Sequence, residues 1–394
     1  MTSTAQAQER VPHPAKTRSP ALGWRVGVLL FATGWGANHF VTLLQVYRAR
    51  LALDAAAPAM LFGMYALGLV PGLLLAGPLS DRRGRRAVVL PSAIVALIAS
   101  AVLGAGGESL VALLLGRLLY GLGAGGVMSA GAVWLIELSS DAAAGPRRAT
   151  IALSAGFGLG PLITGLLAQY APAPVVLPYV VHIAVQLAAL IVAWRAPDRG
   201  GRRGAGPLLR IELDRAAWRR FARGVAPMAP FVFAFPAITF ATLPAMLGGA
   251  LGSAPIAYTG LLCAITLAAG VMAQPITRRF DPVRAARLGL LVGVAGLVLG
   301  LIVVVYQRSA LLLAVAPILG AAYGACMTAG LQNTQRLARP DARGGITGLY
   351  YVLTYVGFAA PLLLAFATRV ATPATALAVT AGLGLAAALV MPRS

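Results

Sequence analysis

The sequence predicts an all-α membrane protein in which twelve transmembrane helices form two halves of six. Its 394 residues are 59% hydrophobic and only 11% charged, whereas soluble domains carry about 25% charged residues, mostly to cover their core. Apolar stretches of roughly 20 residues, long enough to cross a bilayer, recur along the chain. They lack the alternation over about 10 residues that marks the strands of a membrane barrel, so helices must satisfy the backbone in lipid.

The twelve expected spans follow one another with short connections. They cover residues 22–47, 57–79, 87–106, 110–138, 147–170, 176–196, 222–247, 254–276, 285–306, 309–335, 345–369 and 372–391. Residues 1–21 are polar and contain proline, which predicts a disordered cytoplasmic tail. The N-terminal half then occupies residues 22–196, a basic cytoplasmic linker residues 197–221, and the C-terminal half residues 222–394.

Basic residues predict the orientation of the spans. Of the 32 Lys and Arg residues, 27 lie in alternate connections that begin with the N-terminal tail, and 4 lie in the other connections. Because cytoplasmic loops carry the excess of Lys and Arg, both termini should be cytoplasmic. Lysine is nearly absent (only Lys16), which is typical of a GC-rich genome, so we expect a multi-pass protein of the bacterial inner membrane. Topology and anionic lipid explain the net charge of +21, and nucleic acid is not expected as a partner.

Patterns of catalysis or metal binding are not apparent in the sequence. Cys263 and Cys326 both fall inside expected spans, where they fit small apolar positions. His, Cys and carboxylate residues form no cluster with metal-ligand spacing, and no serine nucleophile elbow or phosphate-binding loop is present. We therefore expect no cofactor and no enzymatic activity.

The two halves repeat a pattern. AGPLSDRRGRRAVVL after the second span aligns with AQPITRRFDPVRAARL after the eighth, and AGFGLGPLITGLLA in the fifth span is similar to VGFAAPLLLAFA in the eleventh. Repeated halves joined by a basic cytoplasmic loop are typical of secondary transporters, whose substrate site lies where the halves meet. The repeat therefore favours transport of a small molecule.

The stretch GPLSDRRGRR at residues 77–86 resembles the signature loop between helices 2 and 3 of the major facilitator superfamily. The match is carried by Gly77, Leu79, Ser80, Asp81, Arg82, Gly84, Arg85 and Arg86. The resemblance implies the fold of that superfamily and a cytoplasmic gate in which the aspartate caps a helix of the second half, where negative charge is favoured. The expected gate residues are Gly77, Asp81, Arg82, Gly84, Arg85 and Glu137. The alternative is that these arginines only determine topology.

Two more stretches resemble motifs of the same superfamily. GRLLYGLGAGG in the fourth span places small residues after the intramembrane Arg117, and GFGLGPLITG in the fifth is similar to the antiporter motif. The antiporter-like residues are Gly156, Gly160, Pro161 and Gly165. Thr164 stands where the motif has a glycine. Close helix packing is the alternative role of the small residues. In the second copy of the signature loop, Arg278 stands in place of the aspartate.

Arg117 and His39 are the candidates for proton coupling. An intramembrane Arg is costly unless it has a partner or faces a wet cavity, and snorkelling to the outer surface is the alternative. His39 in the first span lies at nearly the same depth, and the resemblance makes the first and fourth spans neighbours around the cavity. No carboxylate lies well inside any expected span, whereas an imidazole titrates near neutrality. A hydrogen-bonded structural histidine is the other interpretation of His39.

The substrate cavity is expected to include Asn38, Tyr120, Phe235, Tyr323 and Tyr355, although aromatic residues in these spans fit positions against lipid equally well. These features together predict a monomeric antiporter of the superfamily, related to drug and metabolite exporters, that exchanges protons for a small, partly apolar organic compound. Uptake by proton symport or by facilitated diffusion is the alternative among transporters. A receptor-like membrane protein that does not transport is the alternative from another class.

Overall fold

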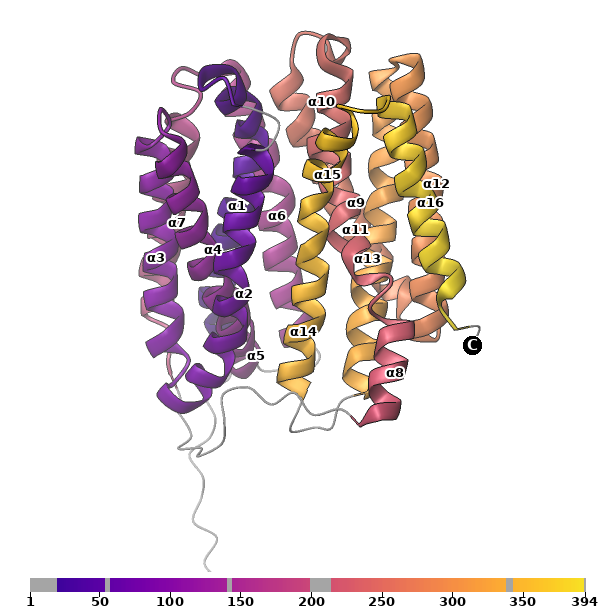
Figure 1. Cartoon of the computed structure of the whole chain (residues 1–394). Helices are drawn as coiled ribbons and strands as arrows, with labels where there is room; N and C mark the ends of the chain where they lie inside the picture. Colours follow the sequence, from indigo (N-terminus) through magenta and orange to yellow (C-terminus); the bar gives the residue numbers. More distant parts are fainter. Residues whose placement is uncertain (1–19, 54–56, 140–143, 199–213, 338–342, 393–394) are drawn as a thin grey trace, which may run out of the picture.

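The computed structural model describes residues 20–53, 57–139, 144–198, 214–337 and 343–392, and every regular element in them is helical (Figure 1). The first half contains α1 (Pro20–Arg50), α2 (Ala57–Arg83), α3 (Arg86–Ala105), α4 (Leu110–Gly126), α5 (Ala132–Leu138), α6 (Ala144–Tyr170) and α7 (Leu177–Trp194). The second half contains α8 (Arg215–Gly224), α9 (Ala229–Ala237), α10 (Leu243–Leu247), α11 (Pro255–Thr277), α12 (Pro282–Tyr306), α13 (Leu312–Leu337), α14 (Arg343–Tyr355), α15 (Ala360–Ala367) and α16 (Pro373–Val390).

Twelve helical stretches of the described chain are long and apolar enough to cross a membrane, which confirms the predicted fold class. Three of them are interrupted. The π-helical turns Val127–Gly131 and Ile238–Thr242 connect α4 to α5 and α9 to α10, and the 3-10 turn Val356–Ala359 connects α14 to α15. Such turns change the direction of the side chains that follow, and they are frequent at functional sites. Sequence analysis treated each of these stretches as one regular helix.

One buried hydrophobic cluster lies wholly in the second half and another wholly in the first, and Figure 1 shows the helices of the two halves as two groups side by side. Helix α2 lies so close to α4 that a Cβ at Gly68 would meet the backbone of Leu118, and a Cβ at Gly121 would meet the carbonyl of Tyr65. Small residues allow such close approach of membrane helices. The glycines of the fourth span therefore hold the first half together.

The linker expected at residues 197–221 is described only at its ends, because residues 199–213 lie outside the described residues, as do residues 1–19 of the expected tail. Helix α8 occupies the end of this linker. Asp214 accepts a hydrogen bond from the amide of Ala217 (2.7 Å) and so caps the helix. Ala217 and Phe221 are buried, whereas Arg219, Arg220 and Arg223 are exposed, so α8 is amphipathic.

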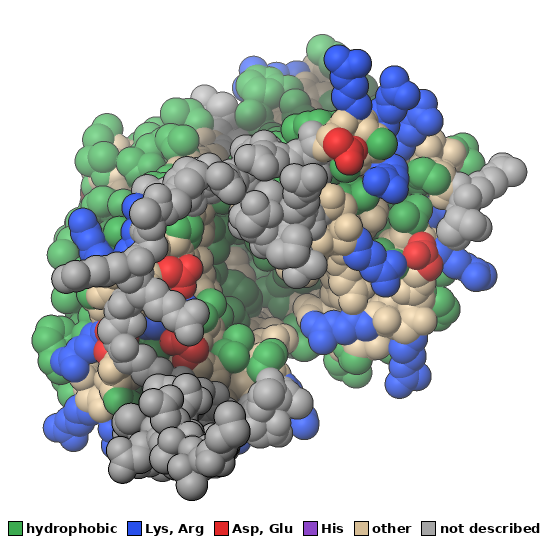
Figure 2. Space-filling model, turned by 90° about the horizontal axis from the view of Figure 1, so that it is seen from below, with side chains coloured by type: hydrophobic (Ala, Val, Ile, Leu, Met, Phe, Trp, Pro, Cys, Tyr) green, Lys and Arg blue, Asp and Glu red, His purple; other side chains and the backbone are tan. Residues whose placement is uncertain are grey.

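The arginine-rich connections between α2 and α3 and between α11 and α12 lie at the same end of the bundle as α8 (Figure 1). We call this end the basic end. Seen from there, blue arginine side chains surround a hollow between the halves whose visible wall is largely apolar (Figure 2). This arrangement agrees with the positive-inside pattern of the sequence, from which we propose that the basic end is cytoplasmic.

Candidate functional site

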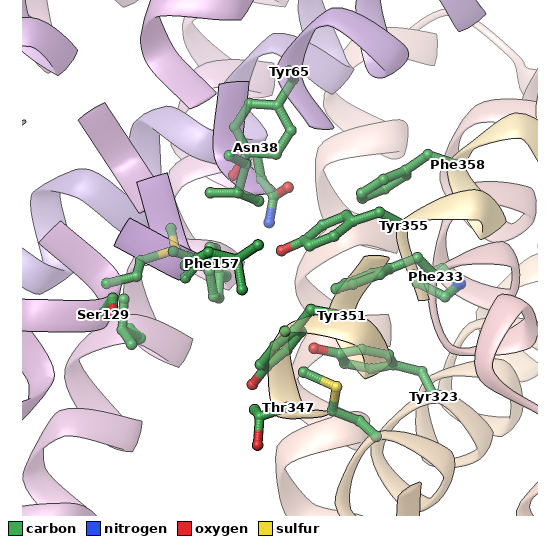
Figure 3. Close-up of a pocket in the computed structure, with 18 of the residues that line it drawn as sticks. Asn38, Tyr65, Ser129, Phe157, Phe233, Tyr323, Thr347, Tyr351, Tyr355 and Phe358 are labelled. Atoms are coloured by element: carbon green, nitrogen blue, oxygen red, sulfur yellow. The ribbon is translucent and has the colours of Figure 1, made fainter. Parts of the chain in front are cut away.

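A cavity of about 620 Å³ lies between the two halves. Both halves line it, with Asn38 on α1, Tyr65 on α2 and Phe157 on α6 opposite an aromatic group from the second half (Figure 3). The three interruptions of the helices all contribute to its wall. The residues they supply are Met128, Ser129, Phe240 and Phe358. The irregular turns therefore position side chains at the interface of the halves.

The second half contributes a stack of aromatic rings. Phe233 lies parallel to Tyr355 (4.8 Å between ring centroids, 14° between planes) and to Phe358 (4.8 Å, 15°). Tyr323 lies 6.0 Å from Phe233, and the hydroxyl of Tyr355 points into the cavity toward the first half (Figure 3). Flat, offset rings provide an apolar surface against which another ring or an apolar body packs.

Few polar groups line this cavity, and none of its described lining residues is charged. Asn38, Ser129, Gln335 and Thr347 supply amide and hydroxyl groups, together with the tyrosine hydroxyls. A largely apolar pocket with a few polar groups is typical of sites for small organic molecules, in which the polar groups fix orientation. This chamber, which we call the aromatic chamber, suits an uncharged apolar or aromatic part of a ligand.

Of the five residues that sequence analysis assigned to the cavity, Asn38, Tyr323 and Tyr355 line it, and Tyr120 and Phe235 do not. Tyr120 is fully buried inside the first half, where its hydroxyl donates to the carbonyl oxygen of Thr33 (3.0 Å). Phe235 is fully buried in the core of the second half. The expectation for these two residues is therefore wrong, because each faces its own half.

A second chamber of about 530 Å³ adjoins the aromatic chamber toward the basic end. The two share lining residues such as Phe157, Met327 and Tyr351, so they form one continuous space. The second chamber is more polar. Its polar lining residues are Thr150, Ser154, Gln274, Arg278, Thr328, Gln332 and Gln335. We call it the vestibule.

The opposite end of the cavity is closed by contacts between the halves. The amide of Gln45 on α1 donates to the hydroxyl of Thr259 on α11 (2.6 Å). Gln169 on α6 accepts a hydrogen bond from the amide of Ile256 (3.0 Å). The rings of Phe62 and Phe358, one from each half, stack at 5.6 Å. The cavity is therefore open toward the basic end and shut at the other.

His39 lies inside the first half and not in the cavity wall. It is fully buried, with its ring edge-on to Tyr179 (4.7 Å between centroids) and His182 (4.9 Å). Within the described residues neither nitrogen of His39 has a hydrogen-bond partner. His182 is different, since its Nε2 lies 3.0 Å from the carbonyl oxygen of Ala32 and its Nδ1 3.1 Å from the hydroxyl of Ser100.

Arg117 is also inside the first half, and with 1% of its surface exposed it does not snorkel to the outer surface. Its guanidinium donates to the carbonyl oxygens of Leu61 on α2 and Ala37 on α1, each at 3.3 Å. It also lies over the rings of Tyr65 (4.2 Å) and Phe40 (4.8 Å). These contacts replace the water that a buried cation loses. The residue connects α1, α2 and α4, as a partnered intramembrane Arg should.

Arg85 of the signature loop forms ion pairs with Asp81 of the same loop and with Glu137 of α5. The Arg85 guanidinium contacts Asp81 (2.6 Å) and Glu137 (2.9 Å) and donates to the hydroxyl of Ser80 (2.6 Å). Burial lowers the pKa of Arg85, but the hydrogen bond and charge of Glu137 together with Asp81 outweigh it and raise that pKa above its ordinary value. All these residues belong to the first half, so the observed ion pairs do not join the two halves.

The backbone of the signature loop explains two of its residues. Gly84 has a φ of 96°, a conformation that favours glycine, and it makes the sharp turn between α2 and α3. Asp198, which follows α7, accepts hydrogen bonds from the backbone amides of Arg85 (3.3 Å) and Arg86 (3.1 Å) at the start of α3. Sequence analysis expected Asp81 to cap a helix of the second half, whereas its carboxylate pairs with Arg85 of its own half. It did not identify Asp198, which caps the start of α3 in the first half.

The antiporter-like residues of α6 face two different helices. A Cβ at Gly156 would meet the backbone of Phe31 on α1, and one at Gly165 would lie 2.9 Å from the carbonyl oxygen of Ile256 on α11. Gly160 also faces α1, and Pro161 faces α11 of the other half. Thr164, the departure from the motif, accepts a hydrogen bond from the indole of Trp35 (3.2 Å). This stretch therefore packs α6 within its half and against the other half.

Comparison with known proteins gives a family match over most of the chain. The Major Facilitator Superfamily is matched at residues 26–361. A glucose transporter, GlcP of Staphylococcus epidermidis, is 36% identical over 87 residues, which are 22% of this chain and 19% of that protein. The chain thus matches about a fifth of the length of this curated relative.

Solved structures share the fold at low sequence identity. The nucleoside transporter NupG superposes with a TM-score of 0.73 at 13% identity, covering 93% of this chain and 98% of that one. A POT family transporter in complex with 5-aminolevulinic acid superposes with a TM-score of 0.74 at 11% identity, covering 93% and 94%. At such identities the likeness concerns the fold alone.

Proposed function

The chain belongs to the major facilitator superfamily, and on this premise we propose that it exports a small organic compound with an aromatic or apolar body by alternating access, in exchange for protons. The observation that carries the proposal is the cavity between the halves, closed at one end by contacts such as that of Gln45 with Thr259 and open at the basic end. A space accessible from one side only is what one state of an alternating-access carrier requires.

Proton coupling is assigned to His39. Every acidic residue of the described chain lies at a helix end or in a loop, so no carboxylate inside a span is available there to hold a proton. His39 is a buried imidazole without a hydrogen-bond partner among the described residues, and imidazole is the side chain that exchanges protons near neutrality. The adjacent residue Asn38 lines the cavity. Coupling would therefore act through α1 and not by direct contact of His39 with the substrate.

Export as the direction is supported by the antiporter-like residues of α6, of which Gly165 packs against α11 of the other half. Uptake by symport uses the same fold and the same cavity. Proteoliposomes with an imposed pH gradient of either sign distinguish the two directions, because an antiporter accumulates its substrate against the proton flow and a symporter with it.

The test of coupling is flux of a metabolite panel into proteoliposomes that contain the His39→Gln variant. Glutamine keeps hydrogen-bonding capacity but does not titrate, so we expect loss of gradient-driven accumulation with some equilibrative flux retained. His182→Gln is the matched control: it removes the bonds to Ser100 and Ala32, so it should lower the melting temperature and leave the gradient dependence intact. Full accumulation by folded His39→Gln would remove His39 from the coupling mechanism. No transport of any compound by the wild type would overturn the proposed function.

A further inference from the structure

The vestibule contains one charged side chain among its described lining residues, Arg278 at the end of α11. Sequence analysis singled out this residue because it stands where the second copy of the signature loop would carry an aspartate. The structure places it not in a folded ion-pair cluster like that of Arg85 but on the wall of the space that leads to the aromatic chamber. The substitution therefore changes the charge that a compound meets on its way in.

Among the described residues, no acid is paired with Arg278. Within the described chain its side chain has no ion pair and no side-chain hydrogen bond, and no acidic residue lines either chamber. The carboxylate of Asp281, three residues further on, has other partners. Its carboxylate accepts hydrogen bonds from the amides of Val283 (2.9 Å) and Arg284 (3.2 Å) and contacts Arg336 (3.5 Å). A cation with unused hydrogen-bond donors thus faces a polar chamber.

The linings of the two chambers suit different parts of one ligand. The aromatic chamber offers stacked rings and no charge, whereas the vestibule offers amide and hydroxyl groups around Arg278. They share Phe157, Met327 and Tyr351, so one elongated molecule can contact both. Guanidinium groups bind planar carboxylates and phosphates through paired hydrogen bonds. On the face seen in Figure 2 blue arginine side chains outnumber the red acidic ones, which favours anions over cations at this end.

We propose that the transported compound is an organic anion with an aromatic or apolar body, whose acidic group is bound by Arg278 in the vestibule. This inference rests on the proposed transport function and specifies its substrate class. The aromatic chamber receives the body, and Arg278 selects acids over uncharged compounds of the same shape. Because Arg278 is exposed to solvent, the attraction is screened by salt, and the preference should decrease as ionic strength rises.

The test compares acids with their neutral amides. Binding to the purified full-length protein is measured for a panel of paired aromatic carboxylates and primary amides, beginning with N-acetyl-tyrosine and N-acetyl-tyrosinamide. An exposed ion pair contributes up to about 1 kcal/mol, so we expect carboxylates to bind up to about fivefold more tightly than their amides at low salt. Arg278→Gln should abolish this ratio, and Arg279→Gln, a change of an exposed neighbour that lines neither chamber, should preserve it.

Each other outcome has a separate meaning. If wild-type protein binds amides as tightly as carboxylates, or if Arg278→Gln weakens both by the same factor, Arg278 has a gating or structural role and the inference fails while the transport function stands. If the panel is neither bound nor carried in proteoliposomes, the proposed function itself fails. Retention of the preference in Arg278→Gln would show that another group selects the acid, and this too would overturn the assignment.

Discussion

Breaking the hydrogen bond between Gln45 and Thr259 should open the end of the cavity that is closed in the structure. The bond joins α1 of the first half to α11 of the second at 2.6 Å, and Thr259 is fully buried. The hydroxyl of Thr259 also donates to the carbonyl oxygen of Pro255 (2.9 Å). Gln45→Leu therefore removes the contact between the halves and leaves the hydroxyl of Thr259 with a partner.

The expected magnitude follows from a single neutral hydrogen bond, which contributes about 1 kcal/mol net. Because this bond exists only while that end is closed, its loss shifts the equilibrium between the two states by about fivefold. Other closing contacts remain, since Gln169 still bonds to the amide of Ile256, so the closed state should persist as a substantial population. Thr259→Val should have a similar effect, and the two changes together should not add.

The assay is a distance measurement by pulsed electron resonance between spin labels on Arg48→Cys and Arg308→Cys. Both residues are exposed, one in each half, and the native Cys263 and Cys326 are buried. Gln45→Leu should increase the population with the longer distance.

Thr380→Val is the control for Thr259→Val, because the hydroxyl of Thr380 also donates to the carbonyl oxygen four residues earlier but, among the described residues, forms no hydrogen bond to the other half. The control should leave the distances unchanged. An unchanged distance distribution in Gln45→Leu would refute the reasoning that this bond stabilises closure. So would an equal shift in the control.

Two further predictions concern the basic end. Asp81→Asn should shift the melting temperature little, because its carboxylate is 63% exposed and an exposed pair contributes at most about 1 kcal/mol; it should lower transport per folded molecule, because Asp81 belongs to the expected cytoplasmic gate. Glu137→Gln, whose partner Arg85 is only 14% exposed, should destabilise the protein more, by about 1–3 kcal/mol. A larger loss of stability in Asp81→Asn than in Glu137→Gln would contradict this order. Cysteines at Ala222 and Pro172 should react with an impermeant reagent from opposite sides of the membrane, Ala222 from the cytoplasm; labelling of both from one side would mean that the span count is wrong.

The sequence predicted the parts of this fold that depend on local composition. Long apolar stretches specify membrane helices without reference to the rest of the chain, and the turn at Gly84 follows from the conformational freedom of glycine. The charged loop at residues 77–86 was identified from its residues and their spacing. These features need no information on how distant helices pack.

The cavity could not be predicted in the same way. In a soluble helix the polar face indicates the solvent side, but nearly every face of these helices is apolar, so periodicity does not distinguish lipid, core and cavity. Phe233 and Phe235 illustrate the problem, because they are two residues apart in one helix, and only Phe233 lines the cavity. Sequence analysis found no feature that predicts the 3-10 turn containing Phe358. Asp198 was missed because its partners, the amides of α3, lie more than 100 residues away.

Arg117, a cation that is costly to bury in a membrane, helps to fix which face of α1 lies toward the cavity. Its guanidinium binds the carbonyl oxygens of Ala37 on α1 and Leu61 on α2, and a planar group with several fixed donors holds two such acceptors better than an ammonium group would. The bond to Ala37 is one residue before Asn38, which lines the cavity, and two before His39, which is buried in the first half. The rotation of α1 that presents Asn38 to the substrate is therefore fixed where Arg117 binds it. We expect any proton-dependent change at His39 to reach the cavity through this same turn of α1.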